Sequence, residues 1–128
     1  MIEMDYTKTT SKSFDEAVDS VIKASESKGF KVQHIHDVEK NVTEKGFQLF
    51  PLKIIEVCNA KFASQVLAEN VMVSLFLPCK INVFKKDGNV TVTATRPAII
   101  SQFFEGVRLK EIALEVDRIV TEIVDNSV

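Results

Sequence analysis

The 128-residue chain has few of the residues that interrupt or cross-link a fold: four glycines, three prolines and two cysteines. With so little glycine and proline and no low-complexity tract, the composition shows no sign of disorder. Two cysteines are too few for the disulfide framework of a small secreted domain, and free thiols are typical of the cytoplasm. Because a chain of this length fits one domain, we expect a single domain over residues 1–128 in a cytoplasmic protein.

Positive charge is not in excess either, since 16 Lys and Arg stand against 18 Asp and Glu. Nucleic-acid binding depends on a basic face, so we expect no nucleic-acid partner. The longest hydrophobic run, residues 71–79, is only about half the length of a membrane span. Residues 1–5 carry acids and lack the basic-then-apolar order of a signal peptide. We therefore expect no membrane association.

Aromatic residues other than Phe are nearly absent, with no Trp and one Tyr beside nine Phe. Four of the Phe residues fall at loop-like positions: Phe47, Phe50, Phe76 and Phe84. Aromatic rings outside a core commonly mark a surface that a partner covers. We therefore expect the protein to form a homodimer.

Several segments carry the end signals and the apolar spacing of helices. Ser13 and Glu16 form a capping box at the start of the first, and Gly29 supplies the left-handed residue that commonly ends a helix. Asn59 is a good N-cap for a later helix. On these signals, helices are predicted at residues 13–28, 37–45, 60–69, 97–104 and 107–124.

Period-two alternation and β-branched residues mark the strands. The Asp87-Gly88 turn predicts a hairpin, and a two-residue loop there places Cys79 opposite Arg96. Strands are predicted at residues 2–9, 30–36, 52–58, 79–86 and 89–96. This order of elements indicates an α+β fold: a single mixed, partly antiparallel sheet of about five strands with helices packed on it.

Two segments bear on the details of that sheet. In the second strand, simple alternation places Phe30, Val32, His34 and His36 on one face, opposite Lys31, Gln33 and Ile35. Residues 71–77 are apolar without a clear period, and they fit either a buried strand or an apolar loop.

Two short motifs carry a resemblance to a known family. Cys58-Asn59 and Leu77-Pro78-Cys79, followed by the Asp-Gly turn, resemble the domain-of-unknown-function 302 family of small bacterial and archaeal proteins. The resemblance runs over nearly the whole chain. It implies a compact α+β domain, often a homodimer, with no established activity. This sequence has Lys85 where members of that family often have an acidic residue.

The two cysteines are the first candidates for chemistry. Cys58 immediately precedes the Asn59 cap, where the positive end of a helix lowers the pKa of a thiol. Cys79 has Arg96 as its predicted cross-strand neighbour, and a cation there acts in the same direction. If their strands adjoin, the two thiols approach disulfide or metal-ligand distance. The alternative is that both are small buried hydrophobic residues, as free cysteines commonly are.

A metal site is the second candidate. His34 and His36 complete a four-ligand set with Cys58 and Cys79 only if the second strand brings them alongside. The spacing does not match a zinc pattern, because the cysteines stand alone at separate strand ends. The alternative is that both histidines are ordinary strand residues, and the sequence indicates no particular cofactor.

Two charged residues complete the set. Glu56, in a central strand beside Cys58, suits a general acid or base, or it pairs with Lys53 or is solvated. Arg96 ends the apolar face of the hairpin, and a cation there needs an anion: a thiolate at Cys79, the Glu56 carboxylate or a bound anionic ligand. The alternative is that Arg96 leaves the sheet and reaches into water.

These residues leave three classes of function open. The first is a binding module with a small-ligand or metal site formed by Cys58, Asn59, Cys79, Arg96 and Glu56. The second is thiol-based redox or sulfur-transfer chemistry, with both cysteines as candidate catalytic residues. The third is a purely structural dimer. No phosphate-binding glycine loop or nucleophile elbow is present, so the sequence leaves enzymatic activity open.

Overall fold

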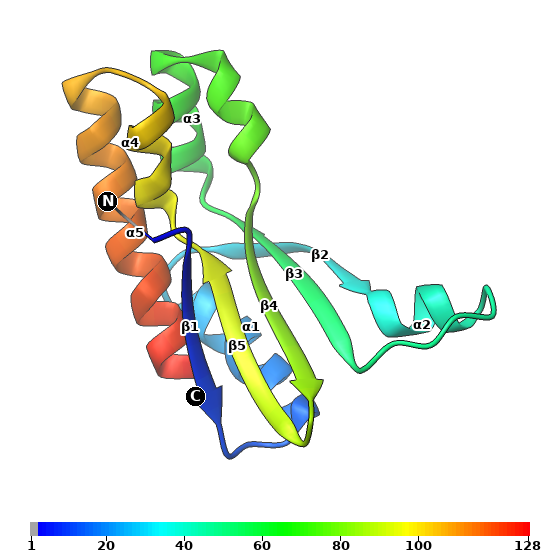
Figure 1. Ribbon diagram of the computed structural model, residues 1–128. Coiled ribbons are helices and arrows are strands. Elements are labelled where there is room, and N and C mark those ends of the chain that lie inside the picture. The colour runs from blue at the N-terminus through cyan, green and yellow to red at the C-terminus, as the bar shows by residue number, and fades with distance from the viewer. Residues whose placement is uncertain (1–2) are drawn as a thin grey trace.

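The computed structural model describes residues 3–128 and shows a five-stranded sheet with helices packed on it (Figure 1). The α+β class and the five strands are confirmed; of the predicted strand 2–9, residue 2 lies outside the described residues. The strand order is β1-β5-β4-β3-β2. The strands are β1 (Asp5–Thr10), β2 (Lys31–Asp37), β3 (Leu52–Cys58), β4 (Cys79–Lys86) and β5 (Asn89–Thr95).

The sheet is antiparallel throughout, whereas the sequence favoured a mixed sheet. The first helix, α1 (Phe14–Ser27), does connect two strands that run in the same direction. These strands, β1 and β2, lie at opposite edges of the sheet rather than side by side. The crossover therefore passes beneath the sheet and creates no parallel pair.

The core lies between one face of the sheet and two long helices, α1 and α5 (Val107–Ser127) (Figure 1). The predicted capping box at Ser13 and Glu16 is confirmed, and Gly29 follows α1 with φ of +80°. The fully buried residues of the sheet include Ile55, Val57, Ile81, Val83 and Val92, and those of α5 include Leu109, Val120, Ile123 and Val124.

The predicted hairpin register is confirmed: Val83 pairs with Val92 and Ile81 pairs with Ala94. The strand β5 ends at Thr95, so the predicted pairing of Cys79 with Arg96 is wrong. The backbone N–H of Arg96 instead donates to the carbonyl oxygen of Met4 at 2.7 Å. Arg96 has already turned away from β4 because the chain enters the next helix at once.

The second strand differs from simple alternation. Its register shifts between Val32, which pairs with Val57, and His34, which pairs with Glu56. An irregularity of this kind inserts an extra residue and exchanges the faces beyond it. The prediction that Val32 shares a face with the two histidines is therefore wrong, since Val32 packs against the core.

Residues 71–77 form neither a strand nor a loop. They hold a six-residue 3-10 helix, η1 (Val71–Phe76), whose first turn is capped by the Asn70 side chain. A cis peptide bond follows between Leu77 and Pro78. The other helices are α2 (Val38–Thr43), α3 (Ala60–Glu69), η2 (Pro97–Ile99) and α4 (Ile100–Phe103). Within residues 3–128, no helix has the length and apolar character needed to cross a membrane.

Candidate binding cavity

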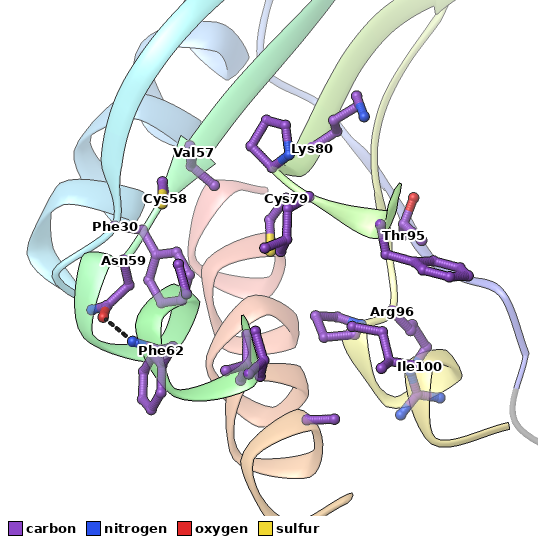
Figure 2. Close-up of a pocket in the computed structure, with 18 of the residues that line it drawn as sticks. Phe30, Val57, Cys58, Asn59, Phe62, Cys79, Lys80, Thr95, Arg96 and Ile100 are labelled. Carbon is purple, nitrogen blue, oxygen red and sulfur yellow. Dashed lines mark hydrogen bonds between the residues drawn. The ribbon is translucent and has the colours of Figure 1, made fainter. Parts of the chain in front are cut away.

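A small cavity of about 80 Å³ lies at one end of the sheet, between the last residues of β3, the first of β4 and helices α3 and α5 (Figure 2). Its walls are largely apolar. Phe30 and Phe62 stack with their ring centroids 6.2 Å apart on one side. Val66, Ile100 and Val116 contribute further apolar walls, so the cavity continues the hydrophobic core.

Both cysteines line this cavity. The strands β3 and β4 are neighbours, and Val57 pairs directly with Cys79, which brings Cys58 beside it as the sequence suggested. Figure 2 shows the sulfur of Cys79 pointing into the cavity. Both residues are free thiols. The expected proximity of the two strand ends is confirmed, and any role of the thiols stays a prediction.

The environment of Cys79 is the opposite of the activating one that the sequence suggested. Burial, and to a smaller extent the nearby Cys58, raise the pKa of the Cys79 thiol to about 11, against a lowering by Lys80. The predicted lowering of this pKa by Arg96 is therefore wrong. Cys79 is a protonated thiol at neutral pH, and it forms part of an uncharged wall.

The start of α3 is fixed by Asn59, as predicted. Its Oδ1 accepts a hydrogen bond from the backbone N–H of Phe62 at 3.0 Å, and its Nδ2 donates to the carbonyl oxygen of Gly29 at 3.1 Å. Both ends of the amide are thus used within the chain. The bonds hold the cavity wall formed by Phe62 against the turn that follows α1.

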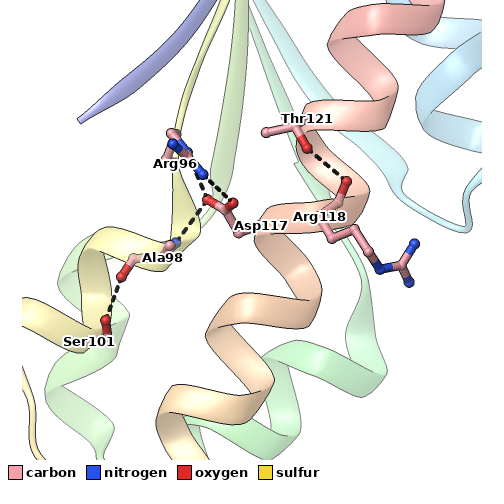
Figure 3. A network of polar contacts seen from close by, with 6 residues as sticks. All are labelled: Arg96, Ala98, Ser101, Asp117, Arg118 and Thr121. Carbon is pink, nitrogen blue, oxygen red and sulfur yellow. Dashed lines mark hydrogen bonds and ion pairs between the residues drawn. The ribbon is translucent and has the colours of Figure 1, made fainter. Parts of the chain in front are cut away.

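Arg96 lines the cavity but finds its anion elsewhere (Figure 3). Its Nε and Nη2 donate to the two carboxylate oxygens of Asp117 at 3.2 and 2.9 Å. The backbone N–H of Ala98 donates to the same carboxylate at 3.1 Å. The expectation that a thiolate, Glu56 or a ligand would supply the anion is corrected by this pair. Arg96 is also not simply solvated, since its side chain is 30% exposed.

Asp117 was missed by the sequence reasoning, although one signal was present. It lies on α5 between Val116 and Val120, within the apolar stripe of that helix, and it is only 6% exposed. A carboxylate on the buried stripe of a helix requires a partner, because an unpaired buried charge is costly. Arg96, at the end of the apolar face of the hairpin, was a cation that needed such an anion, so the two residues could have been matched.

Glu56 and the histidines lie away from the cavity. The Glu56 carboxylate is 3.1 Å from Nε2 of His36, so its partner is not Lys53. The rings of His34 and His36 are 4.3 Å apart on the face of the sheet opposite Val57. The four-ligand set of two cysteines and two histidines is therefore not brought together. Across residues 3–128, no group of three or more His, Cys, Asp or Glu side chains is placed to hold a metal ion.

The model of one protein family, described as a domain of unknown function, DUF302, matches residues 6–127. The chain belongs to the DUF302 family. Among solved structures it is similar to the uncharacterized conserved protein DUF302 from Bacillus stearothermophilus, with 29% identity and a TM-score of 0.93. The match covers 99% of this chain and 100% of that one. No curated protein matches the chain.

Membership of DUF302 accounts for the fold and assigns no activity, so the chemistry must be judged from the cavity. Its walls offer aromatic and aliphatic surface and two thiols, with Arg96 already neutralised by Asp117. Lys80 also borders the cavity, but Figure 2 shows its side chain directed away. Such a space suits an uncharged apolar group.

Proposed function

We propose that this DUF302 protein is a binding module for a small, uncharged apolar ligand, which occupies the cavity between α3, α5 and the ends of β3 and β4. The observation that carries the proposal is the character of the walls. They are formed by core residues such as Val66 and Val116, and their thiol at Cys79 is protonated at neutral pH. Apolar pockets bind by removing apolar ligand surface from water.

The test is a titration with butanol, followed by the amide chemical shifts of residues around the cavity. A ligand that buries about four heavy atoms binds with a dissociation constant on the order of millimolar. We expect the substitution Ala63→Leu, which fills the cavity from α3, to weaken butanol binding by more than about tenfold, because the new side chain takes the ligand's space.

Ala68→Leu is the matched control, since it adds the same side chain to the exposed side of the same helix. This variant is expected to bind butanol as the unmodified protein does. Equal binding by both variants, or shifts confined to residues away from the cavity, would contradict the proposal.

Thiol chemistry is the alternative class, and the environment of Cys79 argues against it. A pKa of about 11 leaves little of the Cys79 thiolate that redox or sulfur-transfer chemistry needs at neutral pH. The half-buried Cys58 is then the remaining nucleophile candidate.

We also propose a cytoplasmic location, since free thiols at a cavity wall persist in a reducing compartment.

We further propose that two copies associate through the face of the sheet opposite α1 and α5. Asn82 lies on β4, the middle strand, and its Oδ1 is buried without a hydrogen-bond partner among the described residues. An amide is self-complementary, and a rotation of the half-buried Asn82 side chain that brings Oδ1 to the surface lets two copies bond each other across a twofold axis. Phe84 lies on the same face and packs against Phe50, while Phe47 is 68% exposed.

Light scattering at micromolar concentration tests this association, with an expected mass about twice the 14.3 kDa of one chain. Asn82→Asp is expected to give the mass of one chain, because two like charges then meet at the axis. Asn126→Asp, an exposed change near the end of α5, should leave the dimer intact. A single-chain mass for the unmodified protein would overturn the proposal.

A further inference from the structure

Four apolar side chains are exposed at the cavity end of the molecule. Val71, Met72 and Leu75 on η1 are 68%, 52% and 75% exposed, and Phe103 on α4 is 62% exposed. We refer to these four residues as the apolar rim. In a 3-10 helix, residues three apart share a face, so Met72 and Leu75 point outward together while Val73 and Phe76 point inward. The rim is thus presented outward by its own backbone geometry.

The rim is continuous with the cavity through Phe76. This residue lines the cavity, and its ring lies 5.5 Å from the ring of Phe103 and 5.8 Å from that of Phe104. Leu77, the next residue, also lines the cavity, as does Ile100 at the start of α4. An apolar path therefore runs from the interior, past Phe76, to the exposed rim.

The volume of the cavity limits what it holds. An apolar cavity of about 150 Å³ accommodates the six carbons of benzene in another protein, so ~80 Å³ holds about three or four carbons. A longer ligand must leave the cavity and lie on the neighbouring surface. The neighbouring surface reached through Phe76 is apolar, and a flexible alkyl chain can follow it out of the cavity.

We infer that the ligand carries an unbranched alkyl chain longer than four carbons, with its end in the cavity and its remainder along the apolar rim. This inference rests on the proposed function and names the chemical class of its ligand. The rim contributes to affinity because each methylene group of the ligand that leaves water strengthens binding. A fully buried methylene group raises the affinity about fourfold. On a half-exposed surface the gain is about twofold for each group.

Butanol and octanol are the probes that test the inference. Octanol has four more methylene groups, so we expect it to bind about fifteenfold more tightly than butanol and to shift the amides of η1 and α4 as well as those of the cavity. Equal affinity for the two alcohols would overturn the inference and leave the proposed function standing. Binding of neither alcohol would overturn the proposed function itself.

The double substitution Met72→Ser and Leu75→Ser removes two exposed side chains from the outward face of η1, so it preserves the fold and the cavity. We expect it to reduce the fifteenfold advantage of octanol to about twofold while butanol binding is unchanged. Phe47→Ser, at an exposed apolar side chain on the connection between α2 and β3, is the control and should change neither affinity. If the double variant alters the mass in light scattering and leaves octanol binding intact, the rim is an interface between copies and the inference is wrong.

Discussion

Alkylation of Cys79 by iodoacetamide is expected to be more than two orders of magnitude slower at about pH 7 than alkylation of an ordinary cysteine. Only the thiolate reacts, and a pKa of about 11 leaves roughly one Cys79 thiol in ten thousand ionised there. A free cysteine, with a pKa of about 8.5, is ionised to a few per cent. The low rate follows from burial in the apolar cavity wall.

The measurement uses the Cys58→Ser variant, so that Cys79 is the single thiol, with mass spectrometry to follow the modification. The rate should rise about tenfold for each pH unit up to about pH 10, because the ionised fraction rises in that proportion below the pKa. The same variant unfolded in urea should react at the ordinary rate. A rate that levels off below about pH 9 would show an accessible thiolate and contradict the assignment.

Asp117→Ala is expected to lower the free energy of unfolding by about 3 kcal/mol, since it breaks a largely buried ion pair and leaves two groups without a partner. The guanidinium of Arg96 loses its bidentate acceptor, and the buried N–H of Ala98 loses the carboxylate oxygen that accepts from it. Because Arg96 is partly exposed, the expected loss of unfolding free energy lies at the lower end of the range for broken buried ion pairs. Urea denaturation of the purified variant measures it.

A companion variant and a control bracket this loss. Asp117→Asn keeps one oxygen, which can still accept from Ala98, but removes the charge and one acceptor of Arg96, so about half of the loss is expected. Glu115→Gln changes an exposed residue of the same helix and should stay within about 0.5 kcal/mol of the unmodified protein. An Asp117→Ala variant as stable as Glu115→Gln would show that the pair does not stabilise the fold.

Most of the fold was predictable because its signals are local. The capping box at Ser13 and Glu16 fixes the start of α1, and Asn59 fixes the start of α3. The Asp87-Gly88 turn sets the register of β4 and β5. Each of these features depends on residues within a few positions of one another, which is the range that sequence patterns describe well.

The wrong predictions concern features that a distant contact or a small backbone irregularity determines. The register shift near Val32 leaves no composition signal, yet it exchanges the faces of the strand beyond it. The 3-10 helix at residues 71–76 has a period of three, which its short apolar run hides. The pair of Arg96 and Asp117 joins residues 21 positions apart, so hairpin register alone assigned Arg96 the wrong neighbour.

The candidate site was predictable only in part. The two cysteines stand at strand ends that the sequence could place side by side, and both line the cavity. Its other walls come from α3, α4 and α5, which are brought together only by tertiary packing. Residues such as Phe62, Ile100 and Val116 look like ordinary core positions in the sequence. Their role in enclosing a space depends on what the fold leaves unfilled.

A crystal of the protein exposed to xenon under pressure tests the central claim most directly. Apolar cavities that exclude water take up xenon. We expect a single strong site between Phe62, Cys79 and Ile100, and no site there in the Ala63→Leu variant. A cavity that stays empty of xenon, or one filled by ordered water molecules in the unmodified protein, would contradict an apolar ligand site.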